Sequence, residues 1–204
     1  MFRNKSFEII TKKTVKSGIK MRRNILPNGE EYEIVLDTQQ IKEGVSRIVR
    51  EIIADYVDTE PPILLIVLNG GLQFGAKISA GLDDADFWNY QDTIKISRYR
   101  EDGVSGETFI TSEPTLDLSV KNIIVVEDLI DEGDTLNYLN KYLKSKKPKS
   151  IKYCVLILKK KHKRLNFKIN YKILDNVDPG WLVGFGMDSN GFGRGYQFVA
   201  RKLI

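Results

Sequence analysis

The sequence has 204 residues, of which 42% are hydrophobic and 29% charged, and its net charge is +5. This length and composition predict one globular domain with a buried core, and the basic balance favours anionic partners such as phosphate esters. The single cysteine excludes an intrachain disulfide, and the single histidine excludes histidine triads and zinc clusters.

Residues 1–32 are rich in lysine and arginine and end in the turn signal Pro27-Asn28-Gly29. We interpret them as an N-terminal extension to a domain that spans residues 33–204. They lack the apolar core of a secretory signal, and no other segment has transmembrane length. We therefore expect a cytoplasmic protein without a membrane partner.

Strands and helices alternate along the rest of the chain. Apolar alternation and apolar runs predict strands at residues 31–36, 63–68, 93–97, 108–111, 123–127, 151–158, 169–174, 181–185 and 196–203. Helical spacing predicts helices at residues 41–56, 72–82 and 136–143, the first of them preceded by a capping box from Asp37 to Gln40. The polar segment 98–107 is expected to be a loop. This alternation predicts an α/β fold with a central, mostly parallel sheet flanked by helices.

The segment 123–136, IIVVEDLIDEGDTL, combines an apolar run with a cluster of acids. We expect the strand to end near Glu127, because a buried strand does not continue through so much charge. The acids then occupy a loop before a helix N-terminus, at the edge where open α/β sheets bind ligands. This segment therefore predicts a site.

The residue types in this loop suit a phosphate together with either a sugar or a metal ion. The turn Gly133–Thr135 at a helix N-terminus would offer N–H groups and a hydroxyl to a phosphate. The Walker lysine and the dinucleotide glycine triplet are both absent. Glu127 and Asp128 suit neighbouring sugar hydroxyls or Mg²⁺. Asp131, which is set slightly apart, could act as a general base that accepts a proton.

The stretch VVEDLIDEGDTL resembles the phosphoribosyl pyrophosphate signature of type I phosphoribosyltransferases, particularly the hypoxanthine-guanine branch. Three other segments resemble that branch in the same order. VLNGG (67–71) is similar to its pyrophosphate loop, 97–107 to its flexible catalytic loop, and WLVGFGMDSNGFGR (181–194) to its purine and magnesium segment. The resemblance extends from about Tyr32 to the C-terminus.

The resemblance implies a type I phosphoribosyltransferase fold with a small hood formed by the terminal segments. It also implies the transfer of a phosphoribosyl group from phosphoribosyl pyrophosphate to a 6-oxopurine, with release of pyrophosphate, as in purine salvage. Mg²⁺ would be the cofactor, and the protein would be a homodimer or homotetramer.

The same resemblance assigns roles to individual residues. Phosphoribosyl pyrophosphate would be bound by Glu127, Asp128, Asp131, Glu132, Gly133, Asp134, Thr135, Asn69, Gly70 and Arg194. The purine would be bound by Lys159, Trp181 and the backbone of Leu182, with Lys160 as the alternative to Lys159. Magnesium would be held by Asp188, Glu127 and Asp128. Asp131 would be the catalytic residue that handles the N7 proton of the base.

Three positions depart from the pattern of the family. Asn69 stands where a lysine is more common, Glu132 where threonine or serine is usual, and Asp134 where a basic or neutral residue is common. An acid beside a phosphate is repulsive, whereas an acid in the first turn of a helix is favourable by about 0.3 to 1 kcal/mol. We therefore expect Asp134 to be a first-turn helix acid that faces solvent, and Glu132 either to weaken the binding of phosphoribosyl pyrophosphate or to indicate a changed substrate.

Purely structural roles compete with three of the functional ones. Trp181 before a strand is typical of a core residue, and Asp188 beside glycines is typical of a turn. Lys159 begins a lysine run of the kind that forms a solvated surface.

Two further functions remain open from the sequence. One is a regulatory nucleotide- or RNA-binding protein on the same scaffold, and the other is a phosphoribosyltransferase for another base. Nucleic acid is not the expected partner, because the lysine runs 144–152 and 159–164 are not interleaved with aromatic residues in a stripe.

Overall fold

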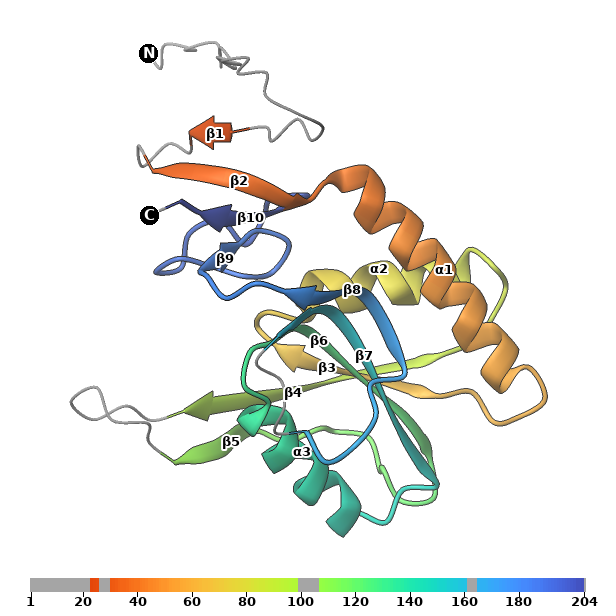
Figure 1. Cartoon of the computed structure of the whole chain (residues 1–204). Coiled ribbons are helices and arrows are strands. Elements are labelled where there is room, and N and C mark those ends of the chain that lie inside the picture. The colour runs from red at the N-terminus through yellow and green to blue at the C-terminus, as the bar shows by residue number, and fades with distance from the viewer. Residues whose placement is uncertain (1–22, 26–29, 99–106, 161–164, 204) are drawn as a thin grey trace, which may run out of the picture.

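The computed structural model describes residues 23–25, 30–98, 107–160 and 165–203 (Figure 1). Its larger sheet has the strand order β5-β4-β3-β6-β7-β8. These strands are β3 (Ile63–Leu68), β4 (Tyr90–Arg98), β5 (Thr108–Ser112), β6 (Asn122–Ile130), β7 (Ser150–Lys159) and β8 (Tyr171–Val177). All neighbouring strands are parallel except β4 and β5, so the predicted mostly parallel sheet is confirmed.

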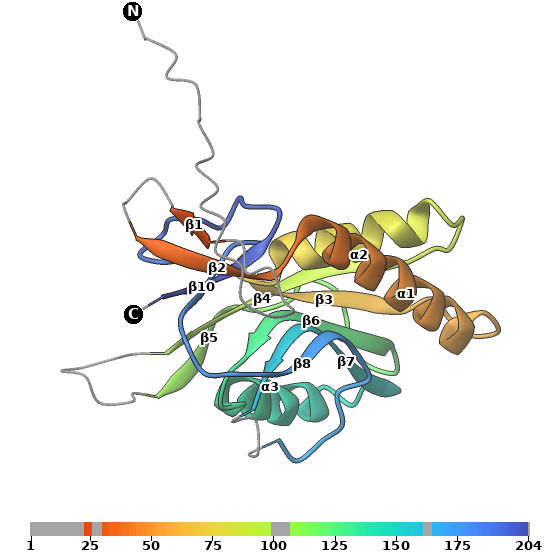
Figure 2. The same cartoon turned by 45° about the horizontal axis from the view of Figure 1, so that its top comes forward.

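Helices cover both faces of this sheet. Helices α1 (Thr38–Tyr56) and α2 (Leu72–Asp83) lie on one face and α3 (Asp134–Ser145) lies on the other (Figures 1 and 2). The central strand β3 is apolar throughout because successive side chains enter opposite cores. Leu64 and Ile66 pack in the core under α1 and α2, whereas Leu65 and Val67 pack in the core under α3.

The predicted start of the first helix is confirmed. The Gln40 N–H donates to Asp37 Oδ1, and the Asp37 N–H donates to Gln40 Oε1, each at 2.9 Å. This reciprocal box satisfies two backbone donors that the helix itself leaves unpaired.

No helix in the part of the chain that the structure describes is both long and apolar enough to cross a membrane.

A second, smaller sheet forms the predicted hood. It has the order β1-β2-β10-β9, and all its pairs are antiparallel. Its strands are β1 (Arg23–Ile25), β2 (Glu31–Leu36), β9 (Leu182–Val183) and β10 (Val199–Lys202). The hood is therefore built from both ends of the chain, and it lies beyond one edge of the large sheet (Figure 1). The division of the chain at residue 32 stays a prediction.

The last strands differ from their predicted bounds. Strand β8 is displaced towards the C-terminus, and β9 and β10 are shorter than the predicted strands 181–185 and 196–203. Between β9 and β10 the chain turns back on itself instead, with isolated bridges from Gly184 to Met187 and from Ser189 to Phe192. The predicted loop 98–107 lies, for residues 99–106, outside the described residues.

The prediction that the acidic strand ends near Glu127 is wrong. Strand β6 continues to Ile130, because it stays paired with β7 as far as Ile130 and Leu158. On its other side the pairing with β3 stops at Val126 and Ile66. Glu127 and Asp128 thus belong to a strand that has lost one neighbour, whereas Asp131, Glu132 and Asp134 follow its end.

Candidate active site

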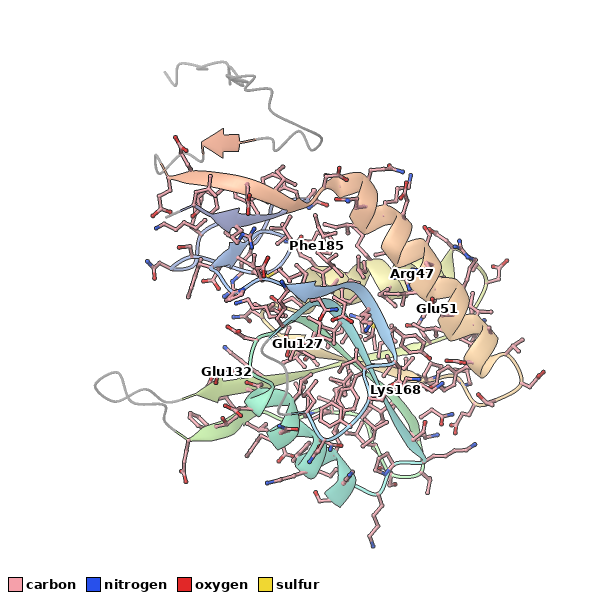
Figure 3. All side chains as sticks on the ribbon, in the orientation of Figure 1. Arg47, Glu51, Glu127, Glu132, Lys168 and Phe185 are labelled. Carbon is pink, nitrogen blue, oxygen red and sulfur yellow. The ribbon has the colours of Figure 1, made fainter. Side chains whose placement is uncertain are left out.

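A pocket of about 510 Å³ opens at the carboxyl ends of β3 and β6 and the start of α3. Its lining includes six of the residues predicted to bind the substrate: Glu127, Asp131, Glu132, Gly133, Asp134 and Thr135. Figure 3 shows Glu127 at the centre of the molecule, under the hood, and Glu132 near the start of α3. The pocket lies where ligands bind in open α/β sheets.

Glu127 and Asp128 form a buried acid pair. Each residue is only 8% exposed, and the Asp128 N–H donates to Glu127 Oε1 at 3.2 Å. Burial raises the pKa of Glu127 well above its usual range, and the charge of Asp128 raises it further. Burial also raises the pKa of Asp128, although hydrogen bonds with the Glu127 side chain and with backbone N–H groups, and then the positive charge of Arg194, act in the opposite direction. Such a pair is costly unless hydroxyl donors or cations approach it.

The turn before α3 has the expected form of a phosphate-binding helix N-terminus. Gly133 precedes the helix in the left-handed conformation, with φ of 96°, and as a glycine it has no side chain with which to cap the helix. Asp134 lies in the first turn, as predicted. The described pocket lining contains four carboxylates and neither lysine nor arginine, so backbone N–H groups are its evident donors for a phosphate.

Asp131 is joined to Lys159, the last residue of β7. The Lys159 Nζ lies 2.9 Å from Asp131 Oδ2, and the lysine side chain is only 7% exposed whereas the aspartate side chain is 54% exposed. Lys159 is therefore not part of a solvated lysine surface. The alternative, Lys160, is half-exposed and pairs instead with Asp178, on the strand-β8 side of the turn.

Three segments that are distant in sequence meet beside Asp128. An ideal Cβ on Gly70 would lie 2.3 Å from Asp128 Oδ2, and an ideal Cβ on Gly186 would lie 1.9 Å from the carbonyl oxygen of Gly70. Only glycine permits these close approaches without a shift of the backbone or the carboxylate. The VLNGG loop, the acid pair and the C-terminal segment therefore form one continuous wall.

Arg194 and Asp188 extend this wall. Arg194 Nη2 lies 2.6 Å from Asp188 Oδ1, and Arg194 Nη1 donates to the Gly186 carbonyl at 2.6 Å. Asp188 Oδ2 also accepts from the Gly191 N–H at 2.6 Å. Asp188 is thus a turn residue, in agreement with the purely structural role that the sequence suggested. Its carboxylate also pairs with Arg194, the residue predicted to bind pyrophosphate.

The two remaining purine-segment residues differ from each other in exposure. The Trp181 side chain is 58% exposed, so it is not a core residue. Leu182 is buried in β9, where it is paired with Arg201 of β10, so its side chain is not accessible to a ligand. Neither residue is among the described lining of the 510 Å³ pocket. Asn69 is exposed at the tip of the loop between β3 and α2.

The donor chemistry of the site fits a hard cation. Asp188, Glu127 and Asp128 offer carboxylate oxygens, which are the ligands that Mg²⁺ prefers. Among the described residues no group of three or more His, Cys, Asp or Glu side chains is arranged to hold a metal by itself. This pattern fits Mg²⁺ bound through one or two carboxylates together with substrate phosphates, rather than an all-protein cage.

Comparison with known proteins decides the family. The sequence profile of the phosphoribosyl transferase domain matches residues 31–190. The chain belongs to the phosphoribosyltransferase family. Among curated relatives, the hypoxanthine-guanine phosphoribosyltransferase of Mycoplasma genitalium is 30% identical over 167 residues, which are 81% of this chain and 93% of the relative. The corresponding protein of Aquifex aeolicus is 29% identical over 167 residues, covering 81% of this chain and 92% of the relative.

Solved structures agree with this membership. A hypoxanthine-guanine phosphoribosyltransferase from Bacillus anthracis superposes with a TM-score of 0.72 at 25% identity, covering 91% of this chain and 100% of that chain. A hypoxanthine phosphoribosyl transferase from Trypanosoma cruzi has a TM-score of 0.76 at 23% identity, covering 83% of this chain and 90% of that chain. The predicted type I phosphoribosyltransferase fold is confirmed.

Two residues near the candidate site were not identified from the sequence. Gln73 donates from the first turn of α2 to the Arg194 carbonyl, and Gly186 contacts Gly70. Gln73 is an ordinary helical residue by sequence, and Gly186 is one of several glycines in its loop. Only the packing of the loop between β9 and β10 against the VLNGG loop and the start of α2 reveals these two contacts.

The buried acid pair predicts a pH-dependent stability. Because Glu127 holds its proton more tightly in the folded protein than in the unfolded chain, its burial destabilises the fold progressively as the pH rises above the usual glutamate pKa of about 4.3. We expect Glu127→Gln to be more stable than the wild type at pH 8, by about 1 kcal/mol or more, and the difference to shrink towards pH 5. Urea unfolding at both pH values, with EDTA present, measures this, and a difference that does not vary with pH would contradict it.

Proposed function

We propose that the protein is a magnesium-dependent purine phosphoribosyltransferase of the hypoxanthine-guanine type, which joins a 6-oxopurine to phosphoribosyl pyrophosphate. The observation that carries this proposal is the buried Lys159 paired with Asp131 at the rim of the acidic pocket. A lysine donor and a carboxylate acceptor held side by side match the O6 and N7 edge of a 6-oxopurine. The names of the relatives support the same substrate class.

The sugar and its phosphate fit the other parts of the pocket. Glu127 and Asp128 are buried carboxylates, and neither forms an ion pair with a lysine or arginine among the described residues. The ribose hydroxyls would donate hydrogen bonds to them. The 5-phosphate would be bound by the N–H groups at the start of α3 and by the Thr135 hydroxyl. Glu132 and Asp134 would then direct their carboxylates away from the phosphate, since like charges repel.

The reaction would proceed by displacement at C1′ of the ribose. A bond forms between C1′ and N9 of the purine, the bond from C1′ to the pyrophosphate oxygen breaks, and the purine loses its N7 proton. Asp131 would accept that proton, and Lys159 would donate to O6. A base with a 6-amino group presents a donor to this lysine, so it would be rejected.

The leaving group would be bound on the opposite wall. Arg194 would contact the pyrophosphate, with Asn69 and Gly70 supplying the loop beside it, and Trp181 would stack on the purine. Asp188, together with Glu127 and Asp128, would hold Mg²⁺ near the pyrophosphate. Bound there, the ion would offset the negative charge that develops on the leaving group. Assembly as a homodimer or homotetramer and a cytoplasmic location stay predictions.

A panel of bases tests the proposal directly. With phosphoribosyl pyrophosphate and Mg²⁺, we expect hypoxanthine and guanine to give nucleoside monophosphate, and adenine and uracil to give none, because only 6-oxopurines match Lys159 and Asp131. Chromatography of labelled products measures this, with xanthine as a third 6-oxopurine. Folded protein that forms no nucleotide from any base would refute the enzymatic proposal, and salt-dependent RNA binding would then favour the regulatory alternative.

Replacing Asp131 tests its role as base. Asp131→Asn should lower kcat by roughly 100-fold or more while it changes the KM for phosphoribosyl pyrophosphate little, because the loss falls on proton transfer. Asp178→Asn is the matched control, since Asp178 also pairs with a lysine but lies outside the pocket. Equal losses in binding and turnover in Asp131→Asn would show that Asp131 is not the base.

The two neighbouring lysines provide a matched test of purine recognition. Lys159→Met should lower kcat/KM for hypoxanthine by roughly tenfold or more, because a buried donor to O6 is lost. Lys160→Met removes a half-exposed lysine paired with Asp178 and should leave that ratio nearly unchanged. Steady-state kinetics on both variants measures this, and the reverse result would identify Lys160 as the purine-binding lysine.

A further inference from the structure

We propose that Gln73 is a positioning residue that holds Arg194 in place for the leaving pyrophosphate, an inference that rests on the proposed function. Gln73 is the second residue of α2, the helix that begins directly after the VLNGG loop. Its Nε2 donates a hydrogen bond to the backbone carbonyl of Arg194, 121 residues further along the chain. Figures 1 and 2 both show the start of α2 beside the loop that joins β9 and β10.

Arg194 is held through both its backbone and its guanidinium. Its carbonyl accepts from Gln73 Nε2 and, at 2.9 Å, from the Gly186 N–H. Its guanidinium donates to the Gly186 carbonyl and pairs with Asp188. The guanidinium and Asp188 are the groups that pyrophosphate and Mg²⁺ would engage. The hold on the carbonyl needs neither group, so it would persist when substrate is bound.

The helix gives this hydrogen bond a fixed origin. Phe74, the next residue of α2, is 0% exposed and belongs to the core under α1 and α2. The backbone of Gln73 is therefore anchored to the large sheet, whereas Arg194 belongs to the segment that continues into the hood. Gly186 also contacts Gly70, so the same loop packs against the large sheet there, but a packing contact does not fix the orientation of Arg194 as a hydrogen bond does. Among the described residues around Arg194, Gln73 supplies the only side-chain hydrogen bond to its backbone from outside its own loop.

A hydrogen bond of this kind orients more than it stabilises. Its net contribution is modest, but a small displacement of a group that binds the leaving atoms weakens binding and catalysis. Loss of the Gln73 donor should therefore affect the pyrophosphate side of the substrate and not the purine side.

The test replaces Gln73 by methionine, which has similar length and helix propensity but no donor. In Gln73→Met we expect the KM for phosphoribosyl pyrophosphate, and for pyrophosphate in the reverse reaction, to rise roughly 3- to 10-fold, with the KM for hypoxanthine within about twofold of wild type. Gln39→Met is the matched control, because Gln39 lies in the first turn of α1 and donates to Glu43 on the surface. It should leave all three KM values unchanged.

A second measurement does not depend on turnover. In the NMR spectrum of the wild type and of Gln39→Met, the Arg194 guanidinium N–H should exchange slowly with solvent, and in Gln73→Met its exchange should accelerate. Gln73→Glu, which also lacks the donor, should behave like Gln73→Met and replaces it if that variant does not fold.

Each outcome decides one claim. Wild-type exchange of the Arg194 guanidinium in Gln73→Met overturns the positioning role, and so does an unchanged KM for phosphoribosyl pyrophosphate. A rise in the KM for hypoxanthine as large as that for phosphoribosyl pyrophosphate would indicate a merely structural role and also overturn it. If the wild type forms no nucleotide, the proposed function fails, and the exchange measurement still decides whether Gln73 positions Arg194.

Discussion

The site depends on a single break in strand pairing. Strands β3 and β6 pair as far as Ile66 and Val126 and then separate, while β6 remains bonded to β7. Without that separation, Glu127 and Asp128 would lie inside a continuous sheet, where two unpaired carboxylates are not tolerated. With it, they are buried but face a gap. The fold therefore keeps two buried carboxyl groups whose pKa values are raised. Hydroxyl donors or cations that approach them would offset the cost of their burial.

The same gap joins the two sheets of the molecule. Gly70 lies against Asp128, and Gly186 lies against Gly70, so a residue of the C-terminal segment contacts a loop of the large sheet through backbone alone. Gln73 and Arg194 add a hydrogen bond across the same boundary. The wall proposed for the leaving group is thus shared between the large sheet and the segment that leads into the hood, whereas the residues proposed to bind the sugar and to accept the proton belong to the large sheet and the turn after β6.

The alternation of apolar runs was enough to predict the sheet and its helices, because periodicity reports local burial. It was insufficient at β6, since charge along a strand also depends on whether both neighbours remain, which is a tertiary property. The sequence pattern alone favoured a solvated Lys159 and a buried Trp181, and the structure shows the reverse for both. Burial of a single residue depends on tertiary packing, which single-residue tendencies lack, so the purine-binding roles that the resemblance implies for Lys159 and Trp181 stay predictions. Gln73 was not predictable, as its partner is 121 residues away.

The hood has a consequence for the order in which the enzyme can be assembled. Strand β2 pairs with β10, so the two ends of the described chain are hydrogen-bonded to each other. A ribosome releases β1 and β2 first, and among the described strands β2 can pair only with β1 until residues 199–202 emerge. The parallel sheet closes with β8 before this, at residue 177. During synthesis, the half of the site proposed to bind the sugar can therefore precede the proposed pyrophosphate wall, and a chain truncated before β10 would retain an incomplete site and leave one edge of β2 without its partner strand.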